Sequence, residues 1–119
     1  MTVIEAIEKA NSTTPNAFSF ETKLDWLNEV EGMVQTQILL LAPEEIITYT
    51  PEDKDHELLV LEPHTSLYPA YIRAQMDFAA SDWNRYQNTH EIFNSLFREF
   101  SAWFATIYRP ADTHEEVYE

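Results

Sequence analysis

The sequence predicts a mainly α-helical domain, and three observations carry that prediction. Apolar residues recur at spacings of three and four along most of the chain, which is the period of a helix with one buried face. The 119 residues include a single glycine, whereas sheets and tight turns usually need several. The composition is 45% hydrophobic, enough for one core. We therefore expect one domain over residues 1–119, a small bundle of about four helices.

The first two helices are expected at residues 2–11 and 20–41. Thr2 and Glu5 form a capping-box pair at the start of the first helix. Ser19 has the side chain needed to cap the second. A linker rich in polar residues and proline separates them.

The second helix presents apolar residues at heptad-like spacing, with Glu31 interrupting the pattern. Three of these positions are assigned to the core: Leu27, Val34 and Ile38. The only glycine, Gly32, lies inside this helix, where it costs about 1 kcal/mol relative to alanine. A close contact with another helix or a kink would explain its presence.

Residues 44–63 are expected to leave the helical pattern. Two short runs have β-type composition, residues 46–50 and 57–61, and a turn-rich acidic loop joins them. Either a short β-hairpin or a pair of extended arms fits this segment. Because two strands alone are barely stable, the segment has to lean on the helices or on a neighbouring subunit.

The third helix is expected to start at Thr65 or Ser66. We divide it from the fourth near residues 80–87, because Asn88 and Glu91 form a second capping-box signal. One continuous helix across this region is the alternative.

The fourth helix is expected over residues 88–109, with Pro110 ending it. Five of its aromatic side chains are assigned to the core: Phe93, Phe97, Phe100, Trp103 and Phe104. They form two adjacent stripes. An apolar arc of this width must be packed on two sides or be covered in an assembly.

The net charge of −14 argues against a protein that wraps DNA, because the phosphates would repel it. Residues 66–109 carry four acidic and four basic side chains, so the negative charge lies elsewhere. It lies in residues 44–65 and in the tail at 110–119, a candidate flexible segment. Solubility explains such charge, and so does a surface that meets a basic partner. Candidate interface or channel-lining residues are Glu52, Asp53, Asp55, Trp83, Tyr86, Glu115 and Glu116.

No motif for catalysis, metal binding or a cofactor is present. The chain lacks cysteine, and its four histidines form no ligand pair at helical spacing. His114, Glu115 and Glu116 could hold a metal weakly, but scattered surface histidines are the simpler interpretation. The acidic loop has neither the glycine nor the closing glutamate of a calcium loop. No apolar run approaches ~20 residues, so we expect no membrane partner. Because no catalytic motif is present, we also expect no enzymatic activity.

Three stretches carry a family resemblance. They are KLDWLNEVEG in the second helix, DKDHELLV after the acidic loop and FNSLFREF in the fourth helix. Together with the opening TVIEAIEKAN they resemble a small family of phage and prophage virion structural proteins of Gram-positive hosts. Members are encoded near portal and capsid genes. The resemblance covers nearly the whole chain, and gene position and size suggest the head–tail connector class, also called adaptor or head-completion proteins.

The resemblance implies a non-enzymatic subunit of a homo-oligomeric ring beneath the portal. Its partners would be other copies of itself, the portal protein and a neighbouring tail or adaptor protein. DNA would pass through without specific binding, and the protein would be made in the host cytoplasm and end up in the virion. Relatives often carry Asn-Gly where this chain has Ala80-Ser81, which removes a helix-stop signal. Two alternatives stay open: another virion or tail-completion protein, and an acidic DNA mimic that inhibits a host protein.

Overall fold

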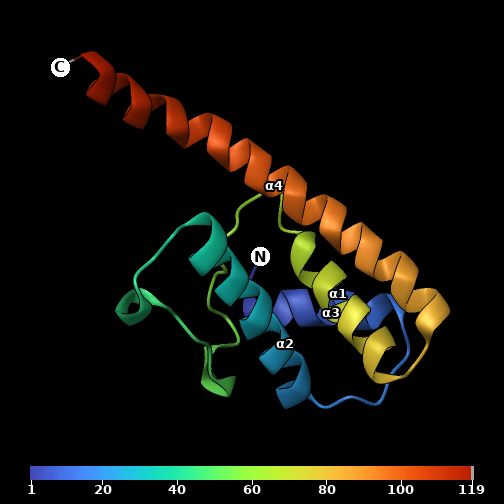
Figure 1. Ribbon diagram of the computed structural model, residues 1–119. Helices are drawn as coiled ribbons and strands as arrows, with labels where there is room; N and C mark the ends of the chain where they lie inside the picture. The colour runs from blue at the N-terminus through green and yellow to red at the C-terminus, as the bar shows by residue number, and fades with distance from the viewer. Residues whose placement is uncertain (119) are drawn as a thin grey trace.

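The computed structural model is a four-helix domain with a long irregular arm (Figure 1). It describes the backbone of residues 1–118 and the side chains of residues 1–107. The helices are α1 (Val3–Thr13), α2 (Phe20–Met33), α3 (Leu67–Ala79) and α4 (Trp83–Tyr118). The predicted mainly α fold class is confirmed. Within the described chain, none of the helices combines the length and apolar character needed to span a bilayer.

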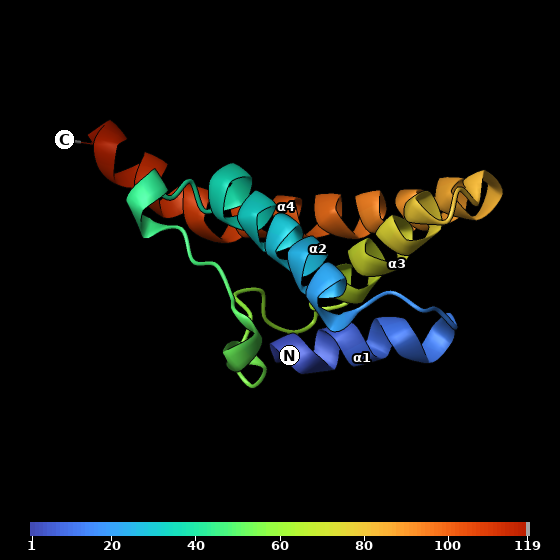
Figure 2. The same ribbon diagram turned by 90° about the horizontal axis from the view of Figure 1, so that it is seen from below.

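Helix α3 lies at the centre of the bundle. It packs against α1, α2 and α4, and its contact with α4 is the most extensive in the molecule. Figure 2 shows α2 crossing in front of α4, with α1 along the opposite side. The fully or nearly fully buried residues of α3 are Leu67, Tyr68, Pro69, Ala70, Ile72, Ala74, Met76 and Asp77. A helix buried over so much of its surface is held in position by packing against its neighbouring helices.

The local signals at the start of α1 and α2 are confirmed. The Thr2 hydroxyl accepts a hydrogen bond from the Glu5 amide at 3.3 Å, and the Glu5 carboxylate accepts one from the Thr2 amide at 2.9 Å. The Ser19 hydroxyl accepts one from the Thr22 amide at 3.1 Å. These side chains satisfy amides that have no partner inside the helix.

The division between α3 and α4 is confirmed, but α4 begins at Trp83, five residues before the predicted cap at Asn88. Ser81 takes a left-handed conformation with φ of 58°. The Ser81 and Asp82 amides then donate to Phe78 and Asp77 carbonyls, which is a Schellman ending. Asp82 caps the next helix by accepting a hydrogen bond from the Arg85 amide at 3.3 Å. Since Asp82 supplies the cap, Asn88 lies inside the helix.

The prediction that Pro110 ends the last helix is wrong, since α4 continues to Tyr118. A proline removes one hydrogen bond from the helical ladder, and a long helix retains the others. The segment expected as a tail is therefore helical over residues 110–118. Figures 1 and 2 both show this end of α4 projecting beyond the other helices.

The second helix is shorter than predicted, because α2 ends at Met33 and a π turn, η1 (Val34–Ile38), follows it. No heavy atom lies within 4 Å of a Cβ built on Gly32, so a close helix contact does not explain this glycine. The change from α to π geometry two residues later agrees with the other explanation, a local distortion. The Thr36 hydroxyl donates to the Gly32 carbonyl at 2.8 Å within this turn.

The segment at 44–63 contains no strand in the described chain, so the hairpin is not formed. Only one isolated bridge, between Thr2 and Glu57, has β-type pairing. The segment is extended and interrupted by two 3-10 turns, η2 (Pro43–Glu45) and η3 (Pro51–Asp53). We call residues 42–61 the arm.

The residues assigned to the core occupy three environments. Leu27, Val34, Phe93 and Phe100 are buried, and Ile38, Phe97 and Phe104 are partly buried against the core. Trp103 is 43% exposed, so it lies at the edge of the core rather than within it. Its position on the α4 face follows the predicted spacing, and its ring lies against those of His64 and Phe100.

Candidate functional site

A buried carboxylate connects α2 to the arm. Glu31 is fully buried, although it was identified in the sequence only as an interruption. Its oxygens accept hydrogen bonds from the Tyr68 hydroxyl at 2.6 Å, the Tyr49 hydroxyl at 2.7 Å and the Leu59 amide at 2.9 Å. The Tyr68 hydroxyl in turn accepts one from the Val60 amide at 2.9 Å. Among the described side chains no salt bridge reaches Glu31, so these donors stabilise its buried oxygens.

The two tyrosines are held as hydrogen-bond donors by their surroundings. Burial raises the pKa of Tyr68 and of Tyr49 above the usual 10.0, and the neighbouring Glu31 carboxylate raises each further. Both hydroxyls therefore stay protonated at neutral pH. Because Glu31 is closed off beneath the arm, the cluster serves to attach the arm, and a solute cannot reach it unless the arm opens.

Two side-chain amides extend this attachment, that of Asn28 in α2 and that of Gln35 in η1. Asn28 accepts from the Tyr49 amide at 2.9 Å and donates to the Tyr49 carbonyl at 3.0 Å. Gln35 likewise accepts a hydrogen bond from the Ile47 amide at 2.7 Å and donates one to the Ile47 carbonyl at 3.0 Å. Asn28, Glu31 and Gln35 share one face of the helix because they are separated by three and four residues. Helix α2 and the η1 turn thus offer the arm a row of donors and acceptors in place of a neighbouring strand.

The predicted acidic residues of the arm have different roles. Asp53 accepts from the Thr50 amide at 2.8 Å, and this hydrogen bond lowers the pKa of its carboxyl group. Asp53 therefore closes the η3 turn. Glu52 and Asp55 are exposed to solvent, although Glu52 also accepts a hydrogen bond from the Thr50 hydroxyl.

The acidic loop also contacts the start of α1. The carbonyls of Lys54 and His56 accept hydrogen bonds from the Ile4 and Val3 amides at 2.9 and 3.0 Å. These amides belong to the first turn of α1, where no intrahelical partner exists. The loop is thereby fixed in position.

A surface group of aromatic side chains lies at the turn between α3 and α4, and we call it the turn cluster. Trp83 is 54% exposed, and its ring centroid is 5.3 Å from that of Phe78. Phe78 also lies 5.3 Å from Tyr86, whose ring stacks on His90 at 5.0 Å. The structure therefore brings the predicted interface residues Trp83 and Tyr86 together.

An apolar pocket lies where α4 leaves the bundle, and we call it the Trp103 pocket. Its volume is about 110 Å³, and its lining is Val34, Leu39, Leu59, Leu61, Phe100, Trp103 and Phe104. The His64 ring lies 5.1 Å from the Trp103 ring. Leu61 is 68% exposed beside it. The pocket lies beside residues 100–104, near the middle of α4, and the turn cluster lies at the start of α4, so these two apolar surfaces are separate.

The position of Glu115 and Glu116 is known only along the backbone of α4, because their side chains lie outside the described residues. The same holds for His114, the third member of the weak metal site considered above. Within side chains 1–107 no group of three histidine and acidic residues is arranged to hold a metal ion.

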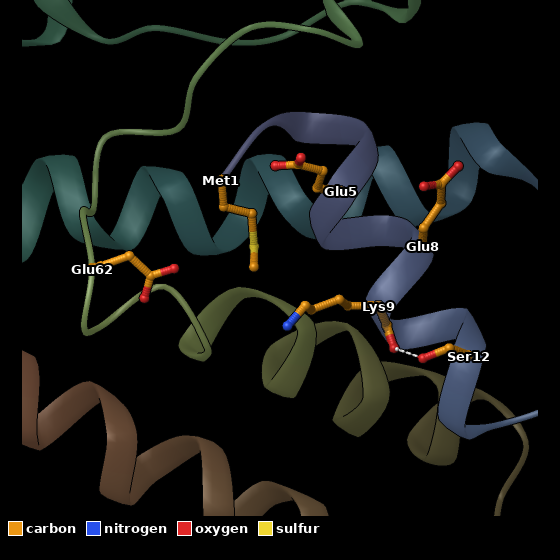
Figure 3. A pocket seen from close by; sticks show the side chains of 6 residues that line it. All are labelled: Met1, Glu5, Glu8, Lys9, Ser12 and Glu62. Atoms are coloured by element: carbon orange, nitrogen blue, oxygen red, sulfur yellow. Dashed lines mark hydrogen bonds between the residues drawn. The ribbon is translucent and has the colours of Figure 1, made fainter.

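A further hollow has a mainly acidic lining along α1 (Figure 3). Its volume is about 410 Å³, and it is bounded by Met1, Glu5, Glu8, Lys9, Ser12 and Glu62. Figure 3 shows Lys9 and Glu62 approaching the hollow from two sides, while Glu8 points away from Lys9. Glu5 is already engaged in the capping box. The groups do not converge on one point, so the hollow is a poor candidate for a binding site.

Comparison with protein-family models, with curated proteins and with solved structures found no match to this chain. The family resemblance given above therefore stays a prediction.

Proposed function

We propose that this chain is a non-enzymatic virion structural protein, a subunit of a head–tail connector ring beneath the portal. The observation that carries the proposal is the exposed apolar surface of the Trp103 pocket, at the base of the projecting end of α4. Exposed apolar patches rimmed by polar residues are typical of protein–protein contacts. Tryptophan is among the residues that contribute most to such contacts.

The position of the two apolar surfaces supports a ring. A ring is built from heterologous contacts, in which one surface of a subunit meets a different surface of the next. The Trp103 pocket is concave, Trp83 of the turn cluster is exposed, and the two surfaces lie at different positions along α4, near its middle and at its start. Residues 66–109 are neutral overall, so contacts through α3 and α4 avoid the repulsion expected between two chains of charge −14.

Light scattering tests assembly directly. We expect the full chain to form a high-order ring, or a stable complex with its cognate portal protein, at low and high salt. Trp103→Ala should abolish this assembly. Ile92→Ala is the matched control, because Ile92 is also exposed on α4 but does not line the pocket. A monomer that ignores portal protein at both salt concentrations would contradict the proposal.

Charge reversal tests a channel-lining role for the acidic loop. We choose Glu52→Lys and Asp55→Lys, because both side chains are exposed, and leave Asp53 unchanged because it caps η3. An acidic channel wall repels DNA and favours sliding. The double variant should therefore assemble normally but slow DNA passage in a packaging or ejection assay. Failure to assemble would show that the loop is an interface.

A further inference from the structure

The arm contains a preformed extended segment with one open edge. Residues 46–50 have the sequence IITYT, in which every residue favours strands. Ile46 and Thr50 have extended backbone angles. Gln35 and Asn28 occupy the amide and carbonyl of Ile47 and of Tyr49 on the inner edge. The segment thus has strand composition and extended backbone angles at both ends, but no strand in the described chain pairs with it.

The outer edge of this segment has unpaired backbone groups at Thr48. On the same edge the Ile46 amide donates to the Pro43 carbonyl, and the amide and carbonyl of Thr50 are both paired with Asp53. In an extended chain the amide and carbonyl of alternate residues point toward the same edge, so Thr48 faces away from α2. Thr48 is exposed, and neither its amide nor its carbonyl has a hydrogen-bond partner among the described residues. Ile47 is 40% exposed beside it. Exposed strand edges are usually blocked by charge or proline, and residues 46–50 contain neither.

The charges around the segment indicate what binds there. Glu44 and Glu45 precede it, Glu52 and Asp55 follow it, and all four side chains are exposed. No basic residue occurs between residues 42 and 53. A second copy pairing through the same edge would place these carboxylates opposite one another, which is destabilising. Complementary charge favours a different chain with basic residues beside its extended core.

We propose that the outer edge of residues 46–50 binds an extended, basic segment of a partner protein by strand addition. Backbone hydrogen bonds to Thr48 supply the pairing, and the flanking carboxylates select the basic residues. The hydrogen bonds from Asn28 and Gln35 lower the entropic cost of binding the partner, because they already hold the segment in its bound conformation. This inference does not depend on a connector ring, because the hydrogen bonds are made by the backbone of Thr48, and the only residues shared with the channel-lining test are the flanking Glu52 and Asp55.

Nuclear magnetic resonance of the isotope-labelled full chain tests the proposal with two peptides, KKTVTVTKK and EETVTVTEE. We expect the lysine peptide to shift the amide signals of residues 46–50 and to slow hydrogen exchange at Thr48. The glutamate peptide should do neither. No response to millimolar lysine peptide would overturn the proposal. Protection of Thr48 by concentrated protein without peptide would replace the partner chain with a second copy.

Two variants separate edge pairing from charge attraction alone. Thr48→Pro removes the outward amide, so binding of the lysine peptide should weaken by at least roughly fivefold. Thr48→Val keeps the amide and should bind normally. A lysine peptide N-methylated at its central residues tests the same hydrogen bonds on unaltered protein, and it should also lose binding. Equal binding by Thr48→Pro and by the N-methylated peptide would overturn strand addition.

Discussion

The helical bundle and the arm are held in place by different kinds of interaction. In the bundle, α3 packs its apolar side chains against three other helices. In the arm, three polar side chains hold the backbone through directed hydrogen bonds: Asn28 and Glu31 of α2, and Gln35 of η1. Apolar packing depends on area and shape and tolerates exchanges of similar volume. Buried hydrogen bonds depend on single atoms, and losing one partner leaves the other unsatisfied. The arm should therefore be far more sensitive to single substitutions.

The largest effect is expected from Glu31→Leu. The substitution leaves the Tyr49 hydroxyl, the Tyr68 hydroxyl and the Leu59 amide without their acceptor. Each buried donor without a partner costs about 1–3 kcal/mol, so the free energy of unfolding should fall by about 3–5 kcal/mol. Urea unfolding measures it. The matched control is Asp25→Leu in the same helix, because Asp25 is exposed and has no hydrogen bond or salt bridge among the described residues; it should cost less than about 1 kcal/mol. Equal losses would contradict the special role of Glu31.

A smaller and more local effect is expected from Gln35→Leu. The substitution removes both hydrogen bonds to Ile47 and places an apolar side chain of similar size in the buried position. We expect a loss of about 1–3 kcal/mol. Hydrogen exchange should accelerate at Ile47 and Tyr49, while amides of α3 keep their protection. Gln37→Leu, an exposed position in the same turn, is the control. Uniform acceleration throughout the protein would show that arm and bundle unfold as one unit.

Alkaline pH should weaken the same attachment. The pKa of Tyr49 and of Tyr68 lies above 10.0 in the folded protein, because both groups are buried beside Glu31. The stabilisation is complete below the unfolded pKa of 10.0. It decreases above that pH, where the unfolded tyrosines lose protons, by about 1.4 kcal/mol per pH unit for each group. Urea unfolding at a series of alkaline pH values measures this loss of stability, and the absorbance of tyrosinate reports the ionisation of the tyrosines. Tyr68→Phe should halve the slope contributed by the pair.

The smallest effects are expected in the bundle, from Gly32→Ala and Ser81→Gly. Gly32 lies in α2 with open space around it, so alanine should fit and stabilise the helix by about 0.5–1 kcal/mol. Ser81 has φ of 58°, a conformation that glycine adopts without steric penalty. Both variants should raise the melting temperature in calorimetry. A decrease at position 32 would indicate that the adjoining π turn needs the glycine.

Much of the bundle could be predicted from the sequence, because its signals are local. The spacing of apolar residues marked the helices, and the capping boxes marked their starts. The start of α4 was missed although Asp82 carries a cap signal, because the stronger-looking pair at Asn88 was preferred. The exposure of Trp103 could not be predicted, since its spacing matches its buried neighbours and only the end of the bundle leaves it uncovered.

The arm shows the limit of local reasoning. Composition predicted that residues 46–50 would be extended, and Ile46 and Thr50 at the two ends have extended backbone angles. Composition could not show that a helix would hold them, because Gln35, Asn28 and Glu31 lie 12, 21 and 28 residues from their respective partners Ile47, Tyr49 and Leu59. A polar stripe at positions 28, 31 and 35 was the available signal, but such a stripe more often faces solvent. The helices and their caps could therefore be predicted from neighbouring residues in the sequence. Which polar side chains are buried was decided only by the tertiary structure, because burial depends on which distant segments pack over them.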